Sequence, residues 1–118
     1  MVRATGPINP RLRALIRKLR KAGKKAKVWA DVAERLSAPR RSRAEVNLSR
    51  INRVGDAAAI VVPGKVLGAG SLSRAPIIAA FKFSTAAARK IIKAGGRALT
   101  IDQLLEMNPE GKGVVIVE

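Results

Sequence analysis

Apolar residues recur with a helical period close to the N-terminus of the chain. Four of them fall at positions i, i+3, i+4 and i+7, and so share one stripe of an α-helix: Leu12, Leu15, Ile16 and Leu19. Asn9 is a favourable N-cap, Pro10 suits the first helical position, and Gly23 is a stop signal. The pattern predicts a first helix over residues 10–23.

A second helix is predicted over residues 28–36, where Val28, Val32 and Leu36 are spaced by four. Trp29 lies beside this stripe, and we expect it to pack in the core. Further along, Val46 and Leu48 indicate a short strand, and a third apolar stripe then ends at Gly55: Leu48, Ile51 and Val54.

The middle of the chain carries a strand signal interrupted by a turn signal. Residues 59–62 are apolar and rich in β-branched side chains, and Pro63-Gly64 fits the central positions of a type II turn. With residues 65–68 as the return strand, the pattern predicts a tight hairpin. Residues 77–83 predict a central strand.

The last third alternates helix and strand signals. Ser84 is the predicted cap of a helix that ends at Gly95-Gly96 and has this buried stripe: Ala88, Ile91 and Ile92. Residues 98–100 predict a brief strand, Thr100 and Gln103 a capping box for a short helix, and residues 113–117 a closing strand. This order of elements predicts a small mixed α/β domain with basic N-terminal helices packed on a sheet, and leaves the strand order open.

We expect residues 1–118 to form a single domain, because a chain of this length is too short to form two hydrophobic cores. Within it we distinguish a basic N-terminal arm and first helix (1–27), a second helix and basic loop (28–54), and a compact α/β core (55–118). We also expect that core to stay folded without residues 1–27.

Positive charge changes this picture most. The chain has a net charge of +16, and residues 1–54 hold 16 Lys and Arg against 3 acids, a net of +13, while residues 55–118 have a net of +3. Such an asymmetry indicates a polyanionic partner, most often nucleic acid. The alternative is a solvated basic surface that only aids solubility.

The absence of two residue types limits the reactions and metal sites that this chain can support. The chain has no His and no Cys, so it has no imidazole base, no thiolate nucleophile and no zinc site of nitrogen or sulfur ligands. No stretch is long enough to span a membrane. We therefore expect a cytoplasmic protein that is not an enzyme, with no catalytic residue, metal, cofactor, small-molecule substrate or homo-oligomer.

The candidate RNA-binding residues lie mostly on the first helix, in the loop after Pro39 and near the third apolar stripe. Arginine offers a planar fork of donors to phosphate, and lysine a point charge. The candidates are Arg3, Arg11, Arg13, Arg17, Lys18, Arg20, Lys21, Lys24, Lys25, Lys27, Arg40, Arg41, Arg43, Arg50 and Lys65.

Several motifs in order resemble one known family. They are Asn9-Pro10-Arg11-Leu12, Val28-Trp29-Ala30-Asp31-Val32-Ala33-Glu34-Arg35-Leu36, Pro39-Arg40-Arg41, Glu45-Val46-Asn47-Leu48-Ser49-Arg50-Ile51, Val62-Pro63-Gly64-Lys65-Val66-Leu67-Gly68-Ala69-Gly70, and Phe83-Ser84 with Lys90-Ile91 and Ala94-Gly95-Gly96. Together they resemble the archaeal and eukaryotic large-subunit ribosomal protein eighteen-e family, which shares its domain with bacterial ribosomal protein fifteen. The length is similar to that of the archaeal members.

The resemblance implies an irregular β-β-α superhelix with the basic N-terminal region outside. It implies a structural constituent of the large ribosomal subunit that binds large-subunit rRNA and neighbouring ribosomal proteins. An architectural DNA-binding or chromatin protein is the alternative that charge alone permits. A small RNA-processing enzyme is a third, weaker one, because only carboxylates and lysines could serve as its base.

Overall fold

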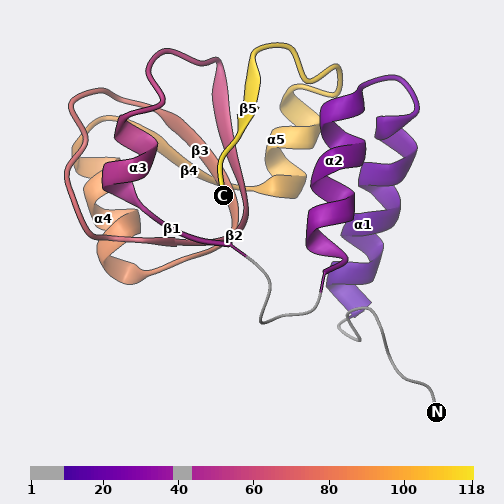
Figure 1. Ribbon diagram of the computed structural model, residues 1–118, viewed down its shortest axis with the longest axis horizontal. Coiled ribbons are helices and arrows are strands. Elements are labelled where there is room, and N and C mark those ends of the chain that lie inside the picture. Colours follow the sequence, from indigo (N-terminus) through magenta and orange to yellow (C-terminus); the bar gives the residue numbers. More distant parts are fainter. Residues whose placement is uncertain (1–9, 39–43) are drawn as a thin grey trace.

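The computed structural model describes residues 10–38 and 44–118, and Figure 1 shows their helices and strands around one sheet. The helices are α1 (Pro10–Gly23), α2 (Lys27–Leu36), α3 (Leu48–Asn52), α4 (Thr85–Lys93) and α5 (Ile101–Met107). The strands are β1 (Ala44–Asn47), β2 (Ala59–Leu67), β3 (Ile77–Phe83), β4 (Arg97–Thr100) and β5 (Val114–Ile116). The predicted mixed α/β class is confirmed, whereas the predicted cap Asn9 and the loop at residues 39–43 lie outside the described residues.

All pairings in the sheet are parallel. The strand order is β1-β2-β3-β4, and β5 also pairs with β2. β5 lies beside the start of β2, where Ala59 pairs with Val114, and β1 lies beside its end, where Leu67 pairs with Asn47. These two short strands therefore share one edge of β2, and β3 occupies the other.

The predicted hairpin at Pro63-Gly64 is wrong, because β2 continues through this pair as one strand and does not fold back on itself. Its pairing with β3 shifts register between Val62 and Lys65, an irregularity that accommodates a proline without an N–H group. Gly64 has no positive φ, which a type II turn would need at this position. A Cβ at Gly64 would lie 2.0 Å from the carbonyl oxygen of Ala44, so the glycine allows β1 to approach β2.

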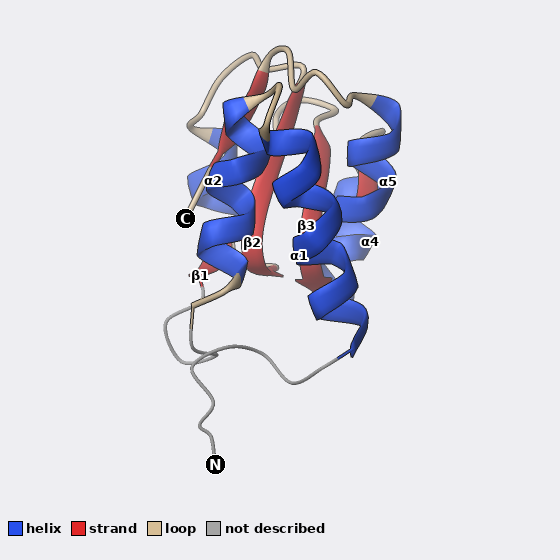
Figure 2. Cartoon of the chain, turned by 90° about the vertical axis from the view of Figure 1, so that its right-hand side faces the viewer, coloured by secondary structure: helices blue, strands red, loops and turns tan. Residues whose placement is uncertain are grey.

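Helices cover both faces of this sheet. α1, α2 and α5 form one apolar cluster with Val61 and Ala79, while α3 and α4 form another with Ile60, Val62 and Ile78. Figure 2 shows α1 and α2 lying across β2 and β3. Parallel strands that are buried on both faces have continuous apolar runs, which explains why residues 59–62 show no polar alternation.

The face that α4 buries differs from the predicted one. Ala87 and Ile91 are fully buried, whereas Ile92 is 67% exposed. Ala87 and Ile91 are four residues apart and point to the sheet together, while Ile92 is turned by about 100° along the helix. Both predicted caps are confirmed: Ser84 Oγ accepts a hydrogen bond from the Ala87 N–H, and Thr100 and Gln103 form a capping box.

α1 is an integral part of the core. Leu12, Ile16 and Leu19 are buried in the same cluster as Trp29, whose burial confirms its predicted packing role. A Cβ on Gly23 would lie 2.6 Å from that of Ala30, so the glycine lets the two helices approach closely. Removal of residues 1–27 would uncover the apolar face of α2, and substitutions are therefore better tests of α1 than deletions.

Candidate nucleic-acid interface

The exposed side of α1 and the turn after it carry a continuous basic surface. Because Leu12, Ile16 and Leu19 face the core, the residues between them point outward. We call this the α1 surface, and its members are all exposed: Arg13, Arg17, Arg20, Lys21, Lys24, Lys25 and Lys27. Residues 10–27 include no acid, so this surface has a single sign of charge.

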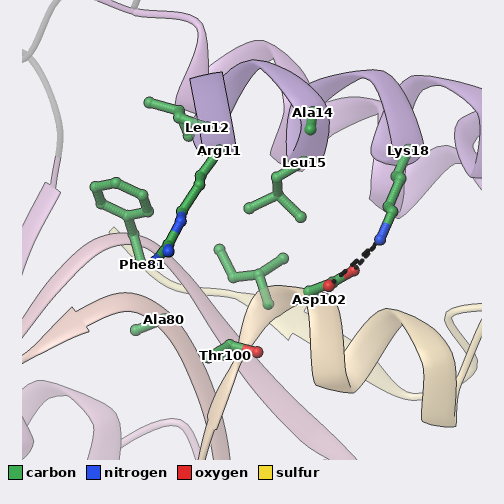
Figure 3. A pocket seen from close by; sticks show the side chains of 10 residues that line it. Arg11, Leu12, Ala14, Leu15, Lys18, Ala80, Phe81, Thr100 and Asp102 are labelled. Atoms are coloured by element: carbon green, nitrogen blue, oxygen red, sulfur yellow. Dashed lines mark hydrogen bonds and ion pairs between the residues drawn. The ribbon is translucent and has the colours of Figure 1, made fainter. Parts of the chain in front are cut away.

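The flank of α1 that faces α5 is different, because it is occupied by a contact within the protein. Lys18 Nζ lies 3.2 Å from Asp102 Oδ1. Figure 3 shows Lys18 pointing from α1 toward Asp102 and Arg11 pointing toward Phe81, in a pocket that Leu15 and Thr100 also line. Lys18 therefore belongs to the predicted set but serves at least partly to fasten α1 to α5.

The remaining predicted residues do not join the α1 surface. Arg50 is exposed on α3, beyond the opposite face of the sheet. Lys65 is half-buried in β2, in register with Glu45 on one side and Lys82 on the other. Arg3, Arg40, Arg41 and Arg43 lie outside the described residues.

Sequence reasoning missed a second group of exposed basic residues, because it averaged the charge of the second half. Residues 44–100 hold 9 Lys and Arg against 2 acids, a net of +7, whereas residues 101–118 hold 1 against 4, a net of −3. No acid occurs between Asp56 and Asp102, a signal that was visible in the sequence. The exposed residues missed in this way include Arg53, Arg89 and Lys93.

Several acidic side chains form ion pairs with basic residues outside the α1 surface. Arg35 Nε donates to Glu118 at 2.5 Å, and this hydrogen bond raises the pKa of the guanidinium above its usual value. Arg74 Nη1 lies 2.6 Å from Asp56 Oδ1.

In the described part of the chain, no group of three or more acidic side chains could hold a metal ion. Nor does a described helix have the length and apolarity to cross a membrane.

Comparison with known proteins gives consistent matches over nearly the full chain. Residues 7–118 match the family model described as "Ribosomal protein 60S L18 and 50S L18e". The chain is 49% identical to the "Large ribosomal subunit protein eL18" of Methanopyrus kandleri, with 97% of this chain and 96% of the relative covered. It is 49% identical to that of Pyrobaculum aerophilum, with 96% and 95% covered, and 46% identical to that of Methanothermobacter thermautotrophicus, with both chains covered completely.

These matches extend through both faces of the sheet, from α1 to β5, and are not confined to one motif. The chain therefore belongs to the family of ribosomal protein 60S L18 and 50S L18e, which are ribosomal proteins and not enzymes.

Proposed function

We propose that this protein is a structural constituent of the large ribosomal subunit that binds and stabilises folded large-subunit rRNA. The observation that carries the proposal is the α1 surface, a one-sign array of Lys and Arg on a helix whose opposite side is buried in the core. Family membership supplies the partner that such a surface fits.

The mechanism is electrostatic and geometric. Each Lys or Arg that contacts a phosphate releases condensed counterions, which favours binding and makes the affinity depend on salt. Because α1 is fixed by Leu12, Ile16 and Leu19, its charges are presented in a set arrangement. Such an array recognises the path of an RNA backbone and its 2′-hydroxyl groups more than the bases.

Aromatic side chains contribute little to this interface. Trp29 is fully buried, and Phe81 and Phe83 are half-buried. A protein that binds single strands uses exposed rings on which bases stack. The surface is therefore suited to folded rRNA, whose backbone is compact and highly charged.

The positions of the Asn and Gln side chains argue against sequence-specific binding of duplex DNA. Neither α1 nor α2 contains Asn or Gln, which recognition helices use to contact base edges. Elsewhere, Gln103 accepts from the Thr100 N–H, Asn52 from Ser73, and Asn108 from the Lys112 N–H. These amides stabilise the fold.

The test compares ligands and assembly. We expect the full chain to remain with large subunits after sedimentation through high salt, and to crosslink to large-subunit rRNA. It should also bind fragments of that rRNA more tightly than random duplex DNA of equal length. Equal affinity for both ligands, together with loss from the subunit in high salt, would favour the DNA-binding alternative.

The Lys18–Asp102 pair gives a finer prediction. Lys18→Gln should lower the slope of log K against log salt less than Arg17→Gln, because the Lys18 charge is shared with Asp102 at 3.2 Å. Both side chains of the pair are about half exposed, so its loss should lower the free energy of unfolding by less than ~1 kcal/mol. Filter binding of rRNA over a salt series and urea unfolding of both variants measure the two effects. An equal slope change in both variants would contradict a structural share for Lys18.

A further inference from the structure

A second basic surface lies on the side of the sheet opposite to α1. It is carried by α3 and α4, which share one apolar cluster, and we call its four exposed basic residues the α3–α4 surface: Arg50, Arg53, Arg89 and Lys93. α3 and α4 pack on one face of the sheet through Ile51 and Ile91, whereas α1 belongs to the cluster on the other face.

The two helices of this surface are fastened to each other by a short loop. The Ser49 N–H at the start of α3 donates to the Ala69 carbonyl oxygen at 3.1 Å. From α4, Lys90 Nζ donates to the carbonyl oxygens of Gly68 at 2.7 Å and Gly70 at 2.9 Å. The side chains of α3 and α4 are therefore presented as one unit.

Lys90 is used inside the protein, but its neighbours on α4 are not. Among the described residues, the ion pairs join Lys18, Arg35, Arg74 and Lys112 to acids, and neither Arg89 nor Lys93 takes part. α4 contains no acid. A lysine near the end of a helix is also favourable for its dipole, but that effect does not require Arg89.

The two basic surfaces face in opposite directions. Figure 1 shows α4 and α1 at opposite ends of the molecule with the sheet between them. The long axis measures 46 Å. A single straight RNA helix lying on α1 would leave the α3–α4 surface uncovered.

We propose that the α3–α4 surface binds the phosphates of a second rRNA segment, so that the protein bridges two segments of folded rRNA. The inference rests on the proposed function and adds to it. Charge complementarity favours RNA over a protein partner, because all four residues of the surface are cations and neither α3 nor α4 contains an acid. A bridging role also explains why the basic charge is divided between two sides of the sheet and is not gathered on one.

The absence of cysteine makes a direct test possible, since each introduced thiol is unique. Single variants Lys21→Cys on α1, Ile92→Cys on α4 and Met107→Cys on α5 each carry an iron–EDTA group that generates hydroxyl radicals. Ile92 and Met107 are exposed at 67% and 51%, so labelling should leave the fold intact. The labelled full chains are bound to archaeal large-subunit rRNA, and the cleaved positions are mapped.

We expect Lys21→Cys and Ile92→Cys to cleave two separate rRNA segments. Met107→Cys, in the acidic stretch, should cleave more weakly. Cleavage from Lys21→Cys alone would overturn the proposal that the protein bridges two rRNA segments, and would leave the proposed function standing. The same conclusion holds if a protein partner covers α4 and prevents cleavage from Ile92→Cys. Strong cleavage only from Met107→Cys, or none from any position, would overturn both.

A pair of substitutions provides a second readout. Arg89→Gln with Lys93→Gln should lower the salt slope of rRNA binding by about 1.4–1.8, from ~0.7–0.9 per phosphate contact. The control Lys112→Gln removes a cation that is paired with Glu110, and should leave the slope unchanged. An unchanged slope in the double variant would overturn the α3–α4 contact, whereas the α1 variants would still report on the proposed function.

Discussion

The triple variant Arg17→Gln, Lys21→Gln, Lys24→Gln is expected to lose about 2–3 from the slope of log K against log salt in rRNA binding, at ~0.7–0.9 per phosphate contact. These three side chains are exposed on the α1 surface. The first 27 residues hold ten Lys and Arg, and if about half of them contact phosphates, this region contributes a slope of about −3 to −4. The variant should therefore remove most of the salt dependence that α1 supplies.

The loss in affinity should be large. If the variant and the parent bind equally well in 1 M salt, a slope change of about 2–3 makes the variant bind on the order of a hundredfold to a thousandfold more weakly in 0.1 M salt. Filter binding to large-subunit rRNA over a salt series measures both quantities. The same experiment with random duplex DNA shows whether the loss concerns charge alone.

Two controls separate binding from folding. Lys112→Gln removes one cation from the acidic stretch, and should leave the slope unchanged. The triple variant should unfold in urea at the same midpoint as the parent, because none of its side chains is buried. A slope equal to that of the parent protein would refute the assignment of the α1 surface.

Elements defined by local chemistry could be predicted from the sequence. The apolar stripe of α1, the Ser84 cap and the Thr100–Gln103 capping box each depend on residues within one or two helical turns. Their structural role follows from neighbours in the chain, and all three are present. The same holds for Trp29, whose position beside a helical stripe already indicated the core.

The errors arose where a distant segment decides the structure. Pro63-Gly64 fits a turn by itself, and only the passage of Ala44 against Gly64 explains the glycine within a continuous strand. On α4, Ile92 is larger than Ala87 and was the better candidate for burial. Because Ile91 points to the sheet, Ala87, one turn before it on the same side of α4, is buried instead.

The candidate site shows the same division. The basic side of α1 could be predicted, because helical periodicity assigns its outward residues. The grouping of Arg50 with Arg53, Arg89 and Lys93 could not, because the charge of a segment does not say which face of the sheet its residues occupy. Arg50 and Arg89 lie 39 positions apart in the sequence, and the fold places both on the side opposite to α1.

Trp29→Ala is expected to lower the free energy of unfolding by about 3–5 kcal/mol, the range for truncating a buried aromatic residue. The side chain extends from α2 and is fully buried in the cluster that α1, α2 and α5 share. Its Nε1–H donates to the carbonyl oxygens of Asn108 at 3.2 Å and Pro109 at 3.1 Å. Since small domains have total stabilities of about 5–15 kcal/mol, this loss is a large share of the total, and the variant should unfold at a much lower urea concentration than the parent.

The matched control is Trp29→Phe, which keeps an aromatic ring and removes the donor. Its cost should be smaller, on the order of 1–3 kcal/mol, because it removes one N–H donor from two partly buried hydrogen bonds and leaves only a modest cavity. Urea unfolding followed by far-ultraviolet circular dichroism compares the variants, since Trp29 is the only tryptophan and its fluorescence is lost in both. Equal losses in the two variants would assign the stability to the hydrogen bonds, whereas a much larger loss in Trp29→Ala assigns it to the packing of α2 against the C-terminal segment. That second outcome is the one we expect, because α1, which bears the RNA-binding surface, is fixed to the sheet chiefly through α2 and the cluster around Trp29.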